Sequence, residues 1–510
     1  MNEKGMVYLI GAGPGDPDLI TLKGQKCMQK ADVVIYDYLA APQHLAFSPE
    51  NAEKIYVGKK GGDHTLSQEG INALLVEKAN QGHCVARLKG GDPFIFGRGG
   101  EEIEALLAEN ISFEVVPGVT SPIAATAYAG IPLTHRRFTS SVAFITGHED
   151  PTKKESSINW SALAEGIGTL VFLMGIKNLP NIRDNLVNAG KSPQTPTAVV
   201  RWGTTPRQKT VQGTLATIHE KVLAAGIKAP AIIVVGEVVQ LREQMRWFEN
   251  RPLLGKRMVI TRSRAQASNL VEQLEAHGTD CMVCPMINII PPDDFSPLDT
   301  AIGNLSDYDW IIFTSVNGVD SFFERLFAAG LDARVIGSVQ IAVIGPATRD
   351  RLRCFGINSD ILPDSYRAES VVEAFQNVNM KGKKVLLPRA RKARPVIPVE
   401  LSKMEAIVDE IACYQTHTVP ESKSQLITAL TEKKVDLITF TSSSTVENFI
   451  EMMSGSDKQA LLEGVILASI GPITTQTATE HGLDVQIEAE KFTIEGLVEA
   501  ILDHYQASND

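Results

Sequence analysis

One glycine-rich stretch carries the residues best suited to hold a ligand. The sequence GGDPFIFGRGGEE, residues 90–102, follows a short apolar and basic run, 85–89, that predicts the end of a strand. Gly90 and Gly91 permit backbone conformations that are costly for other residues. Asp92 places a carboxylate beside open N–H groups, and the next four residues form an apolar wall. Open α/β sheets bind ligands at such strand ends, whereas the alternative is a glycine-rich surface loop.

A second glycine-rich segment, GAGPGDPDLITLKG at residues 11–24, resembles a dinucleotide-binding fingerprint. The third glycine of that fingerprint is replaced by Asp16, and Pro14 removes an N–H donor from the loop that would cradle a pyrophosphate. A second expected strand, 33–36, nevertheless ends at Asp37, about where a ribose-binding acid would fall. An NAD-dependent oxidoreductase is therefore an alternative, although the loop fits it poorly.

The elements that position these residues alternate between strand and helix. Strands are expected at residues 7–10, 33–36, 85–89, 115–116, 142–146, 169–174, 198–201 and 231–235. An amphipathic helix is expected at 67–81, and Thr120 and Ser121 mark another helix start. Several strands end in glycine or a small polar turn, so we expect these ends to converge on one ligand cleft.

The composition is that of a soluble protein with more than one domain. A chain of 510 residues predicts two to four domains, and 44% hydrophobic with 21% charged residues is ordinary for globular proteins. The absence of an apolar run of about 18 residues predicts no membrane span. The N-terminal sequence enters a strand without a signal-peptide pattern. A net charge of −11 argues against general nucleic-acid binding but permits a local basic cleft for an anionic substrate.

The cysteines predict neither a disulfide framework nor a metal site. There are 6 cysteines, and the single CxxC, Cys281 and Cys284, lies in the apolar run CMVCPMINII without a second pair. We interpret that run as a strand rather than a zinc or redox motif. No metal is expected, and the cytoplasm is the expected compartment.

Eight segments of the first half resemble, in order, uroporphyrinogen-III C-methyltransferase of the tetrapyrrole methylase family. They are VYLIGAGPGDPDLITLKG, VVIYDYL, YVGKKGG, RLKGGDPFIFGRGGEE, VPGVTSPIAA, LVFLMG, WGTTPRQ and PAIIVVGEVV. The resemblance covers residues 6 to about 245, within an expected domain of residues 1–245. It implies two α/β subdomains with S-adenosylmethionine between them, and a homodimer formed through this half.

The resemblance also implies roles for single residues. Asp37 matches the proton acceptor of the family and Lys59 its proton donor. Ser121 stands where relatives often have alanine, and it keeps the side chain small. The cofactor would contact Pro14, Gly90, Gly91, Asp92, Ile95, Thr120, Ser121 and Met174, with Thr205 and Ala231 as weaker matches.

The implied chemistry agrees with these residue types. A sulfonium methyl group is already electrophilic, so the enzyme mainly aligns donor and acceptor. As a pyrrole carbon attacks, the ring nitrogen becomes acidic, and Asp37 could accept the proton; the alternative is that Asp37 caps the next helix. The porphyrinogen carries eight carboxylates and needs cationic partners. The candidates are Lys59, Lys60, Arg98, His135, Arg136 and Arg137.

The second half contains an internal repeat. Residues 246–256, RWFENRPLLGK, break the pattern and are interpreted as a linker. Three later segments then recur at nearly the same spacing: MVITR at 258–262 as VLLPR at 385–389, DWIIFTSVNGV at 309–319 as DLITFTSSSTV at 436–446, and AVIGPATRDRLRCFG at 342–356 as ASIGPITTQTATEHG at 468–482. A repeat of this kind indicates two copies of one fold. Its Ser/Thr turns precede expected helix N-termini, which suit carboxylates.

This half resembles uroporphyrinogen-III synthase. The initial TR, then IFTS, IGPAT, VDEIACYQT, FTSSS and IGPIT follow the order of that family. The resemblance implies that residues 257–510 form two flavodoxin-like α/β domains joined by two strands. The first would comprise about 257–290 with 416–510, and the second about 291–415.

The implied reaction closes hydroxymethylbilane with inversion of ring D and requires no cofactor. Tyr414 matches the tyrosine suspected of assisting the leaving group; the alternative is a half-buried strand tyrosine with its hydroxyl in water. Thr348 and Thr474 match two further suspected positions, and they are equally compatible with helix caps. The remaining candidates for holding carboxylates are Arg262, Arg389 and Arg391.

Together these patterns predict a bifunctional enzyme of tetrapyrrole biosynthesis. The second half would convert hydroxymethylbilane to uroporphyrinogen III, and the first would methylate this product at C2 and C7 to precorrin-2, on the route to sirohaem and cobalamin. No nucleic-acid or membrane partner is expected. Besides the oxidoreductase, one alternative remains open: a methyltransferase whose second half only binds tetrapyrroles through their carboxylates.

Overall fold

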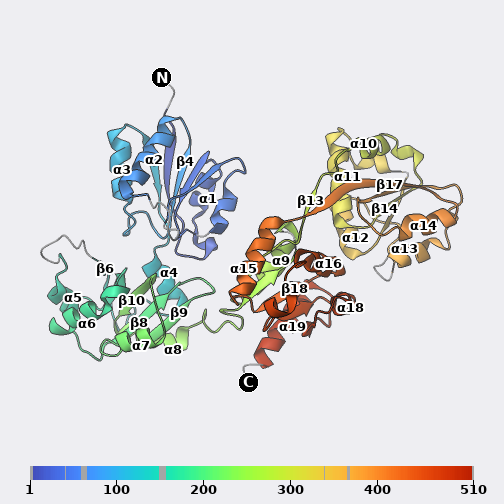
Figure 1. Cartoon of the computed structure of the whole chain (residues 1–510). Helices are drawn as coiled ribbons and strands as arrows, with labels where there is room; N and C mark the ends of the chain where they lie inside the picture. Colours follow the sequence, from blue (N-terminus) through green and yellow to red (C-terminus); the bar gives the residue numbers. More distant parts are fainter. Residues whose placement is uncertain are drawn as a thin grey trace. The chain divides into compact units, whose positions relative to one another are not determined.

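The computed structural model describes residues 4–40, 42–58, 66–148, 157–262, 264–337, 339–363 and 368–507 (Figure 1). The chain divides into two compact units. One comprises residues 1–258 with 270–281 and 501–510, and the other comprises residues 259–269 with 282–500. No helix in the described ranges is long and apolar enough to cross a membrane.

The first sheet is wholly parallel, with the strand order β3-β2-β4-β1-β5. Its strands are β1 (Met6–Gly11), β2 (Val33–Tyr36), β3 (Glu53–Tyr56), β4 (Val85–Lys89) and β5 (Ser112–Val116). Four of them confirm expected strands. The sequence analysis missed β3 because it is an edge strand that begins with the exposed residues Glu53 and Lys54, which interrupt any apolar run.

Helices cover both faces of this sheet (Figure 1). On one face lie α2 (Gln68–Asn80) and α3 (Gly99–Ala108), and on the other lies α1 (Leu22–Met28). The start of α2 confirms the predicted helix, because the Ser67 hydroxyl accepts a hydrogen bond from the Gly70 N–H at 3.2 Å. The central strand β4 is buried along its whole length.

The second sheet is mixed, with the order β6-β7-β10-β8-β9. Its strands are β6 (Val142–Thr146), β7 (Thr169–Leu173), β8 (Pro196–Arg201), β9 (Lys209–Thr214) and β10 (Ala231–Val235). Only β6 and β7 run parallel, and the other neighbours are antiparallel. The expectation that the strand ends converge is therefore wrong for β10. This strand runs antiparallel to β7, so their carboxyl ends point in opposite directions.

The remaining helices of the first half are α4 (Ser121–Tyr128), α5 (Trp160–Gly166), α6 (Leu179–Asn188), α7 (Ile218–Ala224) and α8 (Arg242–Met245). The segment interpreted as a linker packs against α4 in its first part. The Trp247 indole N–H donates to the Ala127 carbonyl at 3.1 Å, and the Phe248 ring lies 4.8 Å from that of Tyr128. Phe248 and Leu253 are buried.

The third sheet has the order β12-β11-β18-β19-β20. Its strands are β11 (Arg257–Ile260), β12 (Asp280–Val283), β18 (Leu437–Phe440), β19 (Ile466–Ser469) and β20 (Ile487–Glu488). Numbered within the sheet this is 2-1-3-4-5, the flavodoxin-like order. Cys281 lies in β12 and Cys284 just after it, both as free thiols, so the strand interpretation of the CxxC is confirmed.

The fourth sheet has the order β13-β17-β16-β14-β15. Its strands are β13 (Ile287–Ile290), β14 (Trp310–Phe313), β15 (Gln340–Val343), β16 (Lys384–Ala390) and β17 (Ile407–Thr418). The run β17-β16-β14-β15 repeats the 2-1-3-4 arrangement, and a parallel bridge from Ala342 to Ile361 takes the place of strand 5. In Figure 1, β13 adds antiparallel to the long strand β17.

The helices of the second half are α9 (Arg264–Ala276), α10 (Ser296–Gly303), α11 (Val316–Ala328), α12 (Pro346–Arg353), α13 (Ala368–Phe375), α14 (Val396–Lys403), α15 (Pro420–Thr431), α16 (Ser443–Met452), α17 (Lys458–Leu461), α18 (Pro472–Glu480) and α19 (Ile494–Ala507). The repeat extends to their packing. The Phe313 and Phe322 rings meet edge to face at 5.4 Å and 75°, and the equivalent Phe440 and Phe449 rings meet at 5.3 Å and 72°. The prediction of two copies of one fold is therefore confirmed.

We expect Phe440→Ala to destabilise the third sheet, because it removes a fully buried ring from this pair. A cavity of this kind costs about 3–5 kcal/mol. Hydrogen exchange measured by mass spectrometry on the full chain should be faster across β18 and α16. Phe492→Ala is the matched control, since that ring is 64% exposed. Equal exchange rates in the two variants would contradict the prediction.

Candidate active sites

The first site forms where glycine loops leave the carboxyl ends of β1, β4 and β5. The Gly91 N–H donates to the Gly13 carbonyl at 2.7 Å, and the Gly13 N–H donates back at 3.2 Å. A Cβ on Gly118 would lie 2.3 Å from the Gly91 oxygen, and Gly91 has a φ of +73°. The loops approach this closely only because these positions lack side chains.

The Asp92 carboxylate joins the loop after β4 to the loop after β5. Its Oδ1 accepts hydrogen bonds from the N–H groups of Phe94 at 2.8 Å and Ile95 at 3.1 Å. Its Oδ2 accepts from the Gly118 N–H at 3.0 Å. The expected pairing of Asp92 with open N–H groups is confirmed, and the structure assigns this carboxylate to shaping the loop.

The apolar side chains after Asp92 point outward from the loop. Phe94 and Phe96 are exposed, although large apolar side chains are usually buried. Phe96 and Arg98 also have positive φ values of 55° and 57°, which cost free energy in residues with a Cβ. Such strained, exposed apolar residues are typical of a ligand-binding surface.

The predicted residues Thr120 and Ser121 lie against the glycine loop. A Cβ on Gly91 would lie 3.8 Å from the Ser121 nitrogen and from the Thr120 Cα. Thr120 is the N-cap residue of α4 and makes no side-chain cap hydrogen bond within the described residues. The N-terminus of α4 therefore faces the loop, where it favours a negatively charged group.

A second group of predicted residues lies at the ends of two neighbouring strands of the second sheet. Ile232 of β10 pairs with Leu173 of β7, and Ala231 pairs with Arg201 of β8. This antiparallel register places the start of β10 beside the end of β7, which Met174 follows. Met174 is 55% exposed and has a φ of 56°. Because β10 runs antiparallel to β7, its first residue, Ala231, lies at the same end of the strands as Met174.

The two subdomains of the first half meet at the loop containing Pro14. The Asp16 N–H donates to the Thr204 hydroxyl at 2.9 Å, and a Cβ on Gly15 would lie 2.6 Å from the Thr205 Cγ2. Pro14 and Thr205, both predicted cofactor contacts, are therefore neighbours across the subdomain boundary.

Asp37 follows β2 and lies beside the glycine loop. Its Oδ1 accepts from the Leu39 N–H at 3.0 Å and its Oδ2 from the Arg87 guanidinium at 3.2 Å. A Cβ on Gly90 would lie 2.4 Å from the Leu39 Cβ, so the two loops touch. Asp37 caps no α-helix, because its carboxylate bonds a turn instead. Lys59 and Lys60 lie outside the described residues.

Arg98 pairs with Glu101 at the surface, where their side chains are 54% and 48% exposed. Its Nε and Nη2 donate to the Glu101 carboxylate at 2.8 and 2.6 Å, and this hydrogen bonding raises the pKa of the Arg98 guanidinium. Arg136 and Arg137 are exposed in the turn after α4, where Arg137 lies 5.6 Å over the Phe138 ring.

The sequence analysis missed three buried charges beneath this site. Arg87 and Lys89 lie in β4 and Glu102 in α3, with side chains that are 4%, 5% and 0% exposed. The signal was present in VARLK, where charges alternate with apolar residues inside a central strand. Charged residues are rarely buried unless paired, so this pattern by itself does not predict burial.

A second missed feature is an aromatic contact across the subdomain boundary. Tyr38, next to Asp37, meets Trp202 edge to face with centroids 5.8 Å apart. The Arg207 guanidinium lies 4.8 Å over the Trp202 ring. Tyr38 and Trp202 are far apart in the chain and meet only in the folded structure, so the sequence around each residue does not predict their contact.

The candidate site of the second half contains Tyr414 on β17. Its hydroxyl lies 3.0 Å from the Ser315 hydroxyl, which accepts from the Gly318 N–H at 3.0 Å at the start of α11. Tyr414 is 8% exposed, so the alternative of a half-buried ring with its hydroxyl in water is wrong. Burial raises the pKa of the Tyr414 phenol, and the hydrogen bonds partly oppose this.

Thr348 and Thr474 occupy equivalent positions in the two repeats. Each is the third residue of its helix, α12 or α18, and each is buried. The N-cap residues are Gly345 and Gly471, so the alternative that these threonines are caps is wrong. Hydroxyls of neighbouring residues meet around α18, where Thr477 donates to Ser443 at 2.8 Å.

The predicted arginines of the second half differ in their surroundings. Arg389 is buried beneath the loop after β16, where its Nη2 donates to the Arg394 carbonyl at 2.6 Å. Burial lowers the pKa of both Arg262 and Arg389. Arg391 is exposed and forms an ion pair with Asp293.

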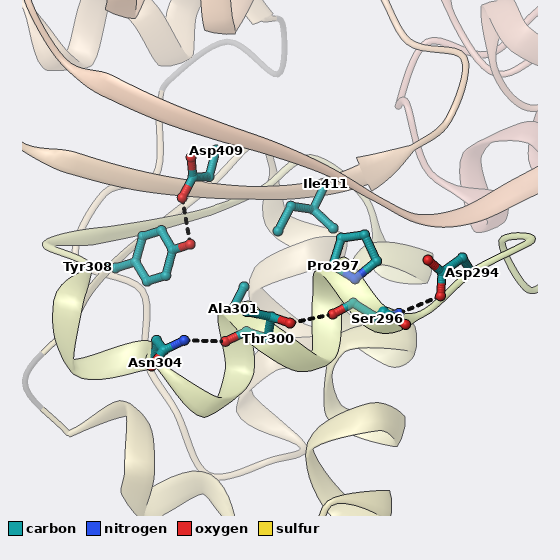
Figure 2. Close-up of a pocket in the computed structure, with 9 residues that line it drawn as sticks. All are labelled: Asp294, Ser296, Pro297, Thr300, Ala301, Asn304, Tyr308, Asp409 and Ile411. Atoms are coloured by element: carbon teal, nitrogen blue, oxygen red, sulfur yellow. Dashed lines mark hydrogen bonds between the residues drawn. The ribbon is translucent and has the colours of Figure 1, made fainter.

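A cavity of about 410 Å³ lies between α10 and β17 (Figure 2). Figure 2 shows that its polar groups are satisfied locally, with the Tyr308 hydroxyl donating to Asp409 at 2.6 Å and the Ser296 N–H donating to Asp294 at 2.8 Å. Asp409 precedes Tyr414 by five residues, or about 16 Å of strand. This cavity is therefore separate from the candidate chemistry. No cluster of metal-ligating side chains occurs among the described residues.

The chain is similar to two protein families. Residues 6–219 match the model of tetrapyrrole (corrin/porphyrin) methylases, and residues 268–499 match that of uroporphyrinogen-III synthase HemD. The porphyrin biosynthesis protein HemD of Ruminiclostridium josui is 40% identical over 98% of both chains. The S-adenosyl-L-methionine-dependent uroporphyrinogen III methyltransferase of Methanosarcina barkeri is 55% identical over 47% of this chain and 94% of its own.

A solved structure is also similar to the first half. It is the uroporphyrin-III C-methyltransferase of Thermus thermophilus in complex with S-adenyl homocysteine. That protein is 40% identical, and the match covers 46% of this chain and 100% of that one with a TM-score of 0.39.

We expect Asp92→Asn to loosen the glycine loop. The amide would turn an N–H toward one of the three N–H groups that the carboxylate now accepts from. Losing hydrogen bonds to a charged group costs about 1.5–3 kcal/mol, which corresponds to exchange about 10- to 100-fold faster. Hydrogen exchange over 90–100 and 117–121 measures this effect. Asp184→Asn, in an exposed ion pair, is the control and should leave both segments unchanged.

Proposed function

The chain belongs to the tetrapyrrole methylase family through its first half and to the uroporphyrinogen-III synthase family through its second, and we propose that it catalyses two consecutive steps of tetrapyrrole synthesis. The second half closes hydroxymethylbilane to uroporphyrinogen III with inversion of ring D. The first half then transfers two methyl groups from S-adenosyl-L-methionine to C2 and C7, giving precorrin-2. This product lies on the route to sirohaem and cobalamin.

One observation carries the methyltransferase proposal: a carboxylate at a strand end lies beside a glycine loop that is shaped to approach a ligand. Asp37 stands beside the loop of residues 90–100 through the contact of Leu39 with Gly90. The α4 N-terminus faces the same loop and suits the carboxylate of an amino acid. The glycine positions leave room for close backbone approach, so these residues fit S-adenosylmethionine.

The residues of the first half have distinct tasks in this proposal. S-adenosylmethionine supplies an electrophilic methyl group when it is bound. Asp92 shapes the loop, while Gly90, Gly91, Ile95, Thr120 and Ser121 line the cofactor from the first subdomain and Pro14 from the loop that reaches the second. Met174, Thr205 and Ala231 line it from the second subdomain. Asp37 accepts the proton released from the pyrrole nitrogen as the carbon is methylated, and Lys59 is the candidate for a proton donor or for a partner of a substrate carboxylate.

The second half uses a buried phenol. A tyrosine hydroxyl is protonated at neutral pH, so Tyr414 can donate a proton to the departing hydroxide. Ser315 fixes the direction of this hydroxyl. The substrate carboxylates bind cationic and hydroxyl side chains, with Arg98 and Arg136 serving the first half and Arg262, Thr348, Arg389 and Thr474 the second.

Further parts of the proposal concern organisation. Residues 1–245 form the methyltransferase, 246–256 connect the halves, and 257–510 form the synthase from 257–290 with 416–510 and from 291–415. The enzyme works in the cytoplasm as a homodimer formed through its first half. It requires no metal, and the synthase half requires no cofactor.

The second candidate is a methyltransferase whose second half binds tetrapyrroles without converting them. The burial of Tyr414 and its bond to Ser315 are compatible with this alternative as well, because a structural tyrosine would have the same surroundings. Purified protein supplied with hydroxymethylbilane and radiolabelled S-adenosylmethionine separates the two. Doubly methylated type III product supports both activities, whereas methylation only of ready-made uroporphyrinogen III would leave the second half as a binding domain.

In this assay we expect Asp37→Ala to reduce methylation to a small residual rate and to leave cyclisation intact. Loss of a general base lowers a rate by about 10²–10⁴-fold. Methylation is measured on added uroporphyrinogen III, and cyclisation on hydroxymethylbilane in the same preparation. A variant that methylates at the unaltered rate would remove Asp37 from this role.

We expect Tyr414→Phe to slow cyclisation by about 10²-fold or more, because it deletes the proton donor. Methylation of added uroporphyrinogen III should not change. Tyr308→Phe is the matched control, since it removes a hydroxyl that hydrogen-bonds Asp409 in the separate cavity of the same sheet. An unchanged cyclisation rate in the Tyr414 variant would identify this tyrosine as structural.

A further inference from the structure

A buried network of four charges connects Asp37 to the centre of the first sheet. Arg87 and Lys89 alternate with apolar residues in β4, so both side chains project from the same face, the face that α3 covers. Glu102 of α3 accepts from Arg87 Nε at 3.0 Å and from Lys89 Nζ at 2.7 Å, both at its Oε1. Two cations thus share one carboxylate oxygen in the interior.

Arg87 uses all of its nitrogens to fix the end of β2. Nε is held by Glu102, while Nη1 donates to the carbonyls of Leu88 at 3.0 Å and Ile35 at 3.4 Å. Nη2 then reaches Asp37 Oδ2 at 3.2 Å. Because Leu39 N–H holds the other oxygen, both oxygens of Asp37 have fixed partners. The Asp37 side chain remains 28% exposed, so the carboxylate is oriented yet accessible to solvent.

This arrangement is costly if its only role is stability. Burying charges requires desolvation, and apolar residues of similar volume often stabilise a fold equally well or better. The burial of Lys89 and its proximity to the Arg87 guanidinium lower the pKa of the ammonium group, which indicates that holding two cations together is unfavourable. The network is therefore better explained by its effect on Arg87, whose guanidinium is held in one orientation beside Asp37.

We propose that Arg87, held by Glu102, is a positioning residue that orients Asp37 for proton transfer in the methylation reaction. The proposal rests on the function proposed above for the first half. Arg87 is buried and touches the reacting groups only through Asp37. Lys89 supplies the second positive charge, so the two cations and two carboxylates together carry no net charge.

The test measures methylation by the full-length chain with Arg87→Met, alone and combined with Asp37→Ala. A misplaced catalytic group loses about 10²-fold in rate, so we expect kcat to fall about 10²-fold while the affinity for S-adenosylmethionine stays unchanged. In the Asp37→Ala background, Arg87→Met should cost little more, because no carboxylate remains to be oriented. Cyclisation by the second half reports on the integrity of the preparation.

Two further variants keep the test decisive. Lys78→Met breaks another ion pair of the same subdomain, with Glu53 at 2.6 Å, and should leave kcat unaltered. Arg87→Lys retains the charge but lacks the nitrogens to reach Glu102, Ile35 and Asp37 together. We expect it to show an intermediate loss with the same non-additivity, and it decides the question if Arg87→Met does not fold.

The outcomes separate the two levels of the proposal. If Asp37→Ala methylates normally, the assigned base is wrong. If Asp37→Ala retains only a small residual rate but Arg87→Met keeps the unaltered kcat, the positioning role alone is overturned. A loss that multiplies with that of Asp37→Ala, or that appears as weaker binding of S-adenosylmethionine, would also overturn it, because a structural defect behaves in this way.

Discussion

The cost of burying charge governs the first half of this protein. Arg87, Lys89 and Glu102 are enclosed between the central strand and α3, where each charge needs a partner. Glu102 partners both cations, and Arg87 extends the pairing outward to Asp37. The Asp37 side chain is thus oriented from the core of the sheet as well as by the loop on which it lies.

The loops of the first candidate site concentrate backbone strain as well as charge. Phe96, Met174, Trp202 and Thr204 have φ values of 55°, 56°, 51° and 70°, and they come from loops of both subdomains. Left-handed backbone costs free energy in residues other than glycine and persists where the surroundings enforce it. The Asp92 carboxylate supplies part of that enforcement through three backbone N–H groups. Loop shape here is determined by contacts between segments.

The second half shows how one repeated topology supports different local chemistry. The edge-to-face phenylalanine pairs are nearly identical in the two copies, so the cores have retained their geometry. The turns above them differ. Ser315 caps α11 and meets Tyr414, whereas Ser442 forms a capping box with Thr445 at the start of α16. Core packing preserves the repeat, while the exposed turns carry the differences.

The sequence by itself determined the elements and the families. Apolar runs and glycine turns located the strands of the first sheet except β3, and the repeated segments predicted two copies of one fold, because periodicity and turn chemistry are local properties. The motifs also located Asp37, Asp92 and Tyr414. Only the tertiary structure decided how they are held: that Arg87 and Glu102 orient Asp37, that Ser315 meets Tyr414, and that the antiparallel β10 brings Ala231 to the same end of the strands as Met174. These contacts join residues far apart in the chain, and a charge within an apolar strand reveals neither its partner nor its burial until the sheet and its covering helix have formed.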